Sequence, residues 1–137
     1  MVVIEQTKVD ILKKAFPSLD MASVQALSRA ARESHFPAGS ILCKQGEIGT
    51  CLFIIKSGEI SVSVRADSET EVQVNTVTPY HYSGEMALLI DDSVRSATLQ
   101  ALVDSEALVI DREPFLKVAD DNPSLLRRLA GQLTDHL

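Results

Sequence analysis

The sequence predicts a mainly β domain of the sandwich or barrel type, with helices at both ends. Short runs with the patterning of strands follow one another through residues 35–111. Five of the six glycines punctuate this stretch, at positions 39, 46, 49, 58 and 84. Strands that recur every ~8–12 residues, with turn residues between them, are typical of sandwiches and barrels. Residues 1–34 and 112–137 show helical spacing instead.

The N-terminal segment predicts two helices. The first is indicated by apolar residues at roughly helical spacing, namely Val2, Val9, Leu12 and Phe16. Pro17 is expected to end it, because proline disfavours helical geometry in the residue before it. Ser18 or Asp20 can cap the second helix. The buried face of that helix is expected to comprise Met21, Val24, Leu27 and Ala31.

The central segment contains five runs that predict strands. Residues 59–65 and 71–77 alternate apolar and polar side chains, which is typical of a strand with one buried face. Residues 52–55 are apolar throughout, which predicts a strand buried on both faces. After a break in the pattern, two more strands are expected at residues 96–101 and 107–110.

The C-terminal segment returns to helical spacing. Asp111 can cap a short turn, and Asn122-Pro123 is a helix start signal, because proline is favoured at the first helical position. A stripe of leucines then predicts a helix, formed by Leu125, Leu126, Leu129, Leu133 and Leu137. Such a stripe usually packs in a core, and part of it is also a candidate interface.

Composition and charge exclude several classes of protein. The 137 residues fit one domain, and 13 basic against 19 acidic side chains argue against a nucleic-acid surface. No apolar run approaches the ~20 residues that cross a bilayer, and no secretory signal is visible, so we expect a cytoplasmic domain without membrane contact. Cys43 and Cys51 are too few for a disulfide framework or a zinc site, and are expected in the core.

The break in the β pattern, residues 83–98, has the chemistry of an anion site. Gly84 precedes a short helical stretch, and the first N–H groups of a helix lack intrahelical partners. Arg95 supplies a planar, permanently charged fork that suits a phosphate, and Ser96 adds a hydroxyl. Glu85 would repel a phosphate but can accept hydrogen bonds from a sugar. A simple surface ion pair of Glu85 with Arg95 is the competing interpretation.

This segment resembles the phosphate-binding cassette of the cyclic nucleotide-binding domain family. The family pattern is approximately F-G-E-x-A-L, an apolar residue, a variable stretch, and R-[S/T/A]-A-T. Here the residues are S-G-E-M-A-L-L, I-D-D-S-V and R-S-A-T. The resemblance extends to the first half of the family's domain, through the residues F-P-A-G at 36–39, G-E-I-G at 46–49 and L-F-I-I-x-x-G-E-I-x-V at 52–62. The resemblance covers about Leu12 to Leu133.

The resemblance implies a β jelly roll (double-stranded β-helix) with N-terminal helices and a C-terminal lid helix. We divide this single domain into helices at 1–34, a jelly roll at 35–111 with its cassette at 83–98, and helices at 112–137. The implied function is a regulatory sensor that binds a 3′,5′-cyclic nucleotide and signals by moving the C-terminal helix. Neither catalysis nor a cofactor is implied. We expect cAMP in preference to cGMP.

The family's binding roles carry over to matching positions. Glu85 would accept the ribose 2′-hydroxyl, and Arg95 would pair with the cyclic phosphate, helped by backbone N–H groups near Ala87. The base would lie against Val62 and Val74, under the helix that starts at Asn122. The expected ligand-binding residues are Gly84, Glu85, Met86, Ala87, Arg95, Ser96 and Ala97. An effector domain or a second copy of the chain is a candidate partner of the C-terminal helix.

Two departures from the family pattern flank the cassette. Ser83 stands where the family usually has an aromatic or other apolar residue, and the loop at residues 79–82 lacks the usual glycine. Tyr82 can supply the missing bulk. Neither departure removes a ligand-contacting group.

Two other functions compete with nucleotide sensing. A degenerate jelly roll would serve as a structural or dimerisation module, but the intact Glu85 and Arg95 count against it. A metal-dependent cupin-like enzyme would use His81 with Glu85, but a second histidine is missing, so no metal site is predicted. No serine or cysteine stands in a recognisable nucleophile motif.

Overall fold

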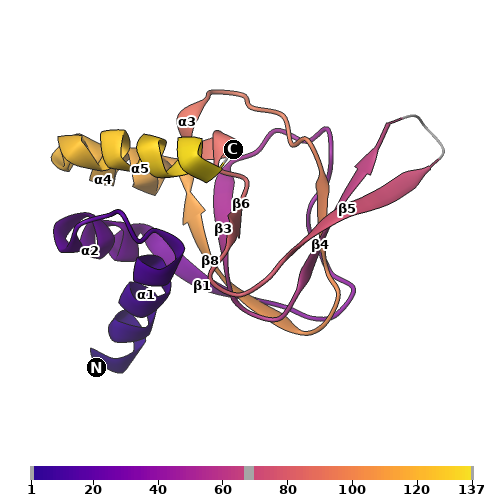
Figure 1. Ribbon diagram of the computed structural model, residues 1–137, viewed down its shortest axis with the longest axis horizontal. Helices are drawn as coiled ribbons and strands as arrows, with labels where there is room; N and C mark the ends of the chain where they lie inside the picture. Colours follow the sequence, from indigo (N-terminus) through magenta and orange to yellow (C-terminus); the bar gives the residue numbers. More distant parts are fainter. Residues whose placement is uncertain (1, 67–69, 137) are drawn as a thin grey trace.

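This computed structural model describes the backbone of residues 2–66 and 70–136, and the side chains of residues 7–66, 70–127 and 129–131. Within these ranges two helices come first, eight strands and a short helix follow, and two helices end the chain (Figure 1). The elements are α1 (Val2–Ala15), α2 (Met21–Ala30), β1 (Ala31–Phe36), β2 (Ile41–Cys43), β3 (Cys51–Ser57), β4 (Ile60–Arg65), β5 (Glu71–Val77), β6 (Tyr82–Ser83), α3 (Met86–Leu89), β7 (Thr98–Ala101), β8 (Ser105–Asp111), α4 (Arg112–Asp121) and α5 (Pro123–His136). No helix in the described part of the chain is long and apolar enough to span a membrane.

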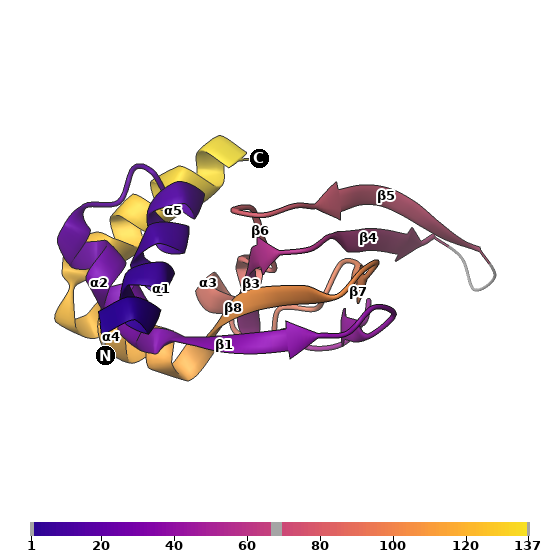
Figure 2. The ribbon, with the colours of Figure 1, turned by 90° about the horizontal axis from the view of Figure 1, so that it is seen from below.

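The strands form two antiparallel sheets of four strands each among the described residues. Their orders are β1-β8-β3-β6 and β2-β7-β4-β5. Apart from the β4–β5 hairpin, successive strands therefore alternate between the sheets in the manner of a jelly roll, which confirms the predicted fold class. Figure 2 shows the helices gathered at one end of this roll, with the β4–β5 hairpin at the other.

Strand β3 lies between two hydrophobic clusters, and this explains its continuous apolar run. Leu52 and Ile54 belong to the helix-side cluster, and Phe53 and Ile55 to the inter-sheet cluster. The helix-side cluster comprises Ile11, Leu12, Ala15, Phe16, Leu19, Val24, Leu27, Ala31, Leu52, Ile54, Tyr82, Leu88, Leu108, Ile110, Phe115, Leu125 and Leu129. The inter-sheet cluster comprises Cys43, Cys51, Phe53, Ile55, Ile60, Val77, Leu99, Ala101, Ala107 and Val109. Because successive side chains of a strand point to opposite faces, β3 contributes to both cores.

The N-terminal helices begin and end close to their predicted limits. Helix α1 ends at Ala15, before Pro17, and Asp20 caps α2 by accepting a hydrogen bond from Ser23 N at 3.0 Å. The side chain of Val2, in the predicted apolar stripe, lies outside the described residues. Ala31 is not on the face of α2 as predicted: it is the first residue of β1 and pairs with Ile110.

Three other boundaries differ from the sequence-based ones. Because β1 starts at Ala31, the segment 1–34 is not helical throughout. Strand β7 starts at Thr98, two residues later than predicted. The short turn expected after Asp111 is the ten-residue helix α4, in which Phe115 is buried and Val118 and Ala119 pack on the helix-side cluster. The Asp111 carboxylate does not cap α4, because it pairs with Arg32 of β1 at 2.9 Å.

The loop before β6 accommodates its missing glycine through tyrosines. Tyr80 adopts φ 71°, the left-handed region that glycine favours, and its N–H donates to Ile55 O at 2.8 Å. The Lys14 ammonium lies 4.4 Å above the Tyr80 ring. Tyr82 is buried and stacks on Phe16 with ring centroids 4.8 Å apart, so it supplies the expected bulk on the helix side. Burial raises the pKa of Tyr82 to about 12.

Helix α5 is attached to the roll through its leucines. Leu125 and Leu129 are buried in the helix-side cluster, whereas Leu126 is exposed. The side chains of Leu133 and Leu137, also in the predicted stripe, lie outside the described residues. Of the described stripe residues, Leu125 and Leu129 therefore pack in the core and Leu126 does not.

Leu125→Ala is expected to lower the free energy of unfolding by about 2–5 kcal/mol, because it leaves a cavity at a position with 0% exposure. Urea unfolding measures the change. Leu126→Ala is the matched control: its side chain is 44% exposed, and the expected change is within about 0.5 kcal/mol. Equal effects of the two substitutions would contradict the docking of α5.

Candidate functional site

The predicted cassette, residues 83–98, lines a cavity of about 210 Å³ together with Gly49. The lining residues are Gly49, Ser83, Gly84, Glu85, Met86, Ala87, Ser93, Val94, Arg95 and Ser96. Six of the seven predicted ligand-binding residues therefore meet at one cavity. Ala97, the seventh, is not part of its lining.

The backbone around Arg95 is fixed by the loop between β2 and β3, residues 44–50. Gly46 N donates to Arg95 O at 2.9 Å, and Arg95 N donates to Glu47 O at 2.7 Å. Gly49 N donates to Ser93 O at 2.8 Å. The two segments thus run as an antiparallel ribbon, which holds Arg95 at the edge of the cavity.

The Arg95 side chain is a buried charge, with 9% exposure. Its Nη2 donates to Cys51 O at 2.7 Å and lies 3.5 Å from Cys51 Sγ. Its Cζ lies 5.4 Å from the centroid of the Phe53 ring, within the range of a cation–π contact. Among the side chains that the structure describes, no carboxylate forms an ion pair with Arg95. A buried cation without a counter-ion is costly and favours an anionic ligand.

Two glycines form a slot for the Arg95 guanidinium. A Cβ at Gly49 would lie 2.8 Å from Arg95 Nε and 3.1 Å from Ala87 Cβ. A Cβ at Gly84 would collide with Arg95 Nη1, and Gly84 also adopts φ 89°. Both positions therefore require glycine for reasons of space, and Gly84 for its backbone conformation as well.

The helix after Gly84 is a single turn, and its free N–H groups lie at its N-terminus. Ala87 N donates to Gly84 O and Leu88 N to Glu85 O, each at 3.1 Å. Within the described residues, the N–H groups of Glu85 and Met86 have no acceptor. The free backbone donors near Ala87 are thus those of the two preceding residues, because the Ala87 N–H itself closes the turn.

The carboxylate of Glu85 is available for a ligand. Glu85 is half-buried, lines the cavity, and forms no ion pair among the described side chains. The competing interpretation, an ion pair of Glu85 with Arg95, is therefore not what the structure contains. Ser96 is exposed, and Met86 is exposed at the start of α3.

The predicted base-contacting residues lie apart from this cavity. Val62 is on β4 and packs on the inter-sheet cluster, and Val74 is on β5 with 59% exposure. The register pairs Val62 with Asn75, beside Val74, so the two valines are on neighbouring strands. In the described part of the chain α5 packs on the helix-side cluster, and Val74 is exposed.

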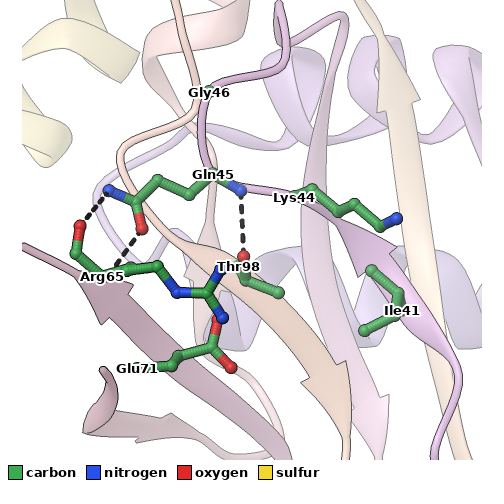
Figure 3. A pocket seen from close by; sticks show the side chains of 7 residues that line it. All are labelled: Ile41, Lys44, Gln45, Gly46, Arg65, Glu71 and Thr98. Atoms are coloured by element: carbon green, nitrogen blue, oxygen red, sulfur yellow. Dashed lines mark hydrogen bonds between the residues drawn. The ribbon is translucent and has the colours of Figure 1, made fainter. Parts of the chain in front are cut away.

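A second cavity, of about 560 Å³, contains none of the predicted ligand-binding residues (Figure 3). Its lining is Ile41, Lys44, Gln45, Gly46, Arg65, Glu71 and Thr98. Gln45 Nε2 donates to Arg65 O at 3.1 Å, and Arg65 N donates to Gln45 Oε1 at 2.7 Å. This amide therefore ties the end of β4 to the loop at residues 44–50.

Cys43 and Cys51 are free thiols buried on strands, as predicted. Burial raises the pKa of both thiols, and the charge of Arg95 opposes that shift. His81 is exposed, with its Nδ1 3.2 Å from Thr78 Oγ1. Among the described residues no group of three His, Cys, Asp or Glu side chains is placed to hold a metal ion.

Several residues that the structure places around Arg95 or in the cavity lining were assigned no site role from the sequence. Cys51 and Phe53 hold Arg95 from β3, and Ser83 and Ser93 line the cavity. Gly49 had a visible signal, its place in a glycine-rich stretch, but its role depends on a contact with Arg95 that only the fold creates.

Known proteins resemble this chain in sequence and structure. A family model described as "Cyclic nucleotide-binding domain" matches residues 33–122, more than half of the chain. A cGMP-dependent protein kinase of Caenorhabditis elegans is 31% identical over 121 residues, 87% of this chain and 15% of the kinase. A cAMP-dependent protein kinase regulatory subunit of Schizosaccharomyces pombe is 33% identical over 110 residues, 80% of this chain and 26% of the subunit. The chain thus spans under a third of the length of these two relatives.

A solved structure shows the same likeness. The catabolite activator protein of Thermus thermophilus superposes with a TM-score of 0.77 at 29% sequence identity. The match covers 90% of this chain and 57% of that one.

Gly49→Ala is expected to lower the free energy of unfolding by about 1–3 kcal/mol, because its Cβ would press on Arg95 Nε. In the Arg95→Ala variant, Gly49→Ala should lower the free energy of unfolding by less than half as much. A double-mutant cycle with urea unfolding measures this difference. Gly131→Ala is the control: a Cβ there meets nothing within 4 Å, and alanine should stabilise α5 by about 0.5–1 kcal/mol. Additive effects at positions 49 and 95 would contradict the slot.

The two thiols are expected to resist alkylation in the folded protein at neutral pH. Burial holds their pKa above the ordinary 9.0, so the reactive thiolate forms only at higher pH. Mass spectrometry after iodoacetamide treatment at pH 7.5 should find neither thiol modified in native protein and both modified in urea. Rapid labelling of native Cys51 would show that the residue beside Arg95 is not buried.

Proposed function

Since the chain belongs to the cyclic nucleotide-binding domain family, we propose that it binds a 3′,5′-cyclic nucleotide in the cavity between Glu85 and Arg95. The cyclic phosphate would pair with Arg95, and the ribose 2′-hydroxyl would donate to Glu85. The single observation that carries this proposal is the buried guanidinium of Arg95, which lacks a carboxylate partner among the described side chains.

The chemistry of the cavity supports this orientation of the ligand. A guanidinium and a phosphate form charge-assisted hydrogen bonds, about twice as strong as neutral ones. Glu85 and Met86, whose N–H groups are free, also line the cavity and add donors to it. Glu85 itself is an acceptor, so it favours the hydroxyl side of a sugar phosphate over its charged side.

The net charge of the chain makes local donors decisive. At −6 the overall field opposes an anionic ligand. The favourable binding energy that overcomes this repulsion must therefore come from short-range contacts with Arg95 and the neighbouring N–H groups. Salt screens such contacts much less than it screens interactions between distant charges.

The output of the domain is regulatory. The family is regulatory and not catalytic, and its kinase members carry separate catalytic domains, so we assign no enzymatic activity to this chain. We propose cAMP as the ligand, ahead of cGMP, and motion of α5 as the response. A nucleotide can move α5 only by binding one helix arrangement more tightly than the other. The exposed surface at Val74 leaves room for such a closure over the base.

Isothermal titration calorimetry with cAMP and cGMP tests the proposal. The wild-type chain should bind, and Arg95→Ala should weaken binding at least ~100-fold, because it removes the charge that neutralises the phosphate. Glu85→Ala should weaken binding by about 10-fold. Arg32→Ala is the control, since Arg32 pairs with Asp111 away from the cavity. A wild-type chain that binds neither nucleotide would instead be a structural or dimerisation module.

A further inference from the structure

Ser83 lines the cavity but has no part in the proposed binding mode. It is the last residue of β6, directly before Gly84 and Glu85. Its side chain is neither buried nor fully exposed. Within the described residues its hydroxyl has no hydrogen-bond partner, so the cavity contains an uncommitted polar group.

The pairing of β6 with β3 gives the direction of the Ser83 side chain. Ser83 pairs with Phe53, and Tyr82 pairs with Ile54. Directly paired residues of antiparallel strands point to the same face of the sheet. Tyr82 and Ile54 both belong to the helix-side cluster. Ser83 therefore shares the opposite face with Phe53, which belongs to the inter-sheet cluster.

That face is the one on which Arg95 lies. The Arg95 guanidinium is 5.4 Å above the Phe53 ring, and its Nη1 fills the space where a Cβ of Gly84 would be. Ser83 is the cross-strand neighbour of Phe53 on this face, so Ser83 and Arg95 lie on the same side of the sheet. One charged donor, the Arg95 guanidinium, and one neutral donor, the Ser83 hydroxyl, thus belong to the lining of the same cavity.

We propose that Ser83 is a ligand-binding residue that donates its hydroxyl proton to the phosphate held by Arg95. A serine hydroxyl offers one donor, and a phosphate oxygen beside a guanidinium is an acceptor that both groups can share. This inference rests on the proposed function, because the phosphate is that of the cyclic nucleotide. It adds a contact from β6, outside the seven residues carried over from the resemblance.

The test compares nucleotide affinity in four forms of the full chain: wild type, Ser83→Ala, Ser83→Thr and Ser34→Ala. Ser83→Ala should weaken cAMP binding by about 10-fold, the effect of one hydrogen bond to a charged group. Ser83→Thr keeps the hydroxyl and should stay within about 3-fold of wild type. Ser34, on β1 and outside the cavity lining, serves as the matched control and should leave affinity unchanged.

The two phosphorothioate diastereomers of cAMP separate a direct contact from a structural effect. Each replaces one exocyclic phosphate oxygen with sulfur, a weaker hydrogen-bond acceptor. Ser83→Ala should therefore weaken one diastereomer as much as cAMP and the other far less. Equal losses for both would overturn the contact, even if overall affinity falls.

The failure of this inference is distinguishable from failure of the proposed function. Wild-type affinity in Ser83→Ala, while Arg95→Ala still abolishes binding, would overturn the role of Ser83 and leave the function standing. No binding of cAMP or cGMP by the wild-type chain would overturn both.

Discussion

The burial of one arginine charge is the constraint that organises this domain. Arg95 reaches its place only because β3 presents the Cys51 carbonyl and the Phe53 ring, and because Gly49 and Gly84 leave space on either side. The loop at residues 44–50 then fixes the Arg95 backbone. Segments that are distant in sequence must therefore assemble together before the guanidinium can be held. A site built this way is rigid, because each partner of the arginine belongs to a sheet or to the ribbon beside it.

Sheet β1-β8-β3-β6 connects this site to the helices. Its one face packs in the inter-sheet cluster under Arg95, and its other face packs against α1, α2, α4 and α5 through the helix-side cluster. Tyr82, one residue from the cavity lining, stacks on Phe16 at the end of α1. A displacement of β6 would therefore also displace the residues that pack on Tyr82 from the helices, because close-packed interiors transmit strain.

Local patterning predicted much of the fold and the residue types of the site. The alternation at residues 59–65 and 71–77 and the apolar run at 52–55 depend only on which faces are buried, and they correspond to β4, β5 and β3. Glu85 and Arg95 were visible because both lie in the short segment that breaks the β pattern and resembles the phosphate-binding cassette. The start of β1 at Ala31 could not be predicted in this way. No proline or glycine separates β1 from α2, and the pairing of β1 with β8 determines where the strand begins. The positions of Gly49, Cys51 and Ser83 around Arg95 depend on strand register, which a single sequence does not specify.

The contacts of Gly49 and Gly84 with Arg95 also constrain the order in which substitutions at these three positions can occur during evolution. While Arg95 is present, a side chain at position 49 or 84 meets its guanidinium, so these three positions are not free to drift independently. A descendant that lost the arginine first would lose the clash with it at both glycine positions. Side chains could then accumulate at position 49, where no unusual backbone angle opposes them, and would fill the slot. An arginine could return at position 95 only after glycine had returned at position 49. Loss of the buried charge is therefore difficult to reverse.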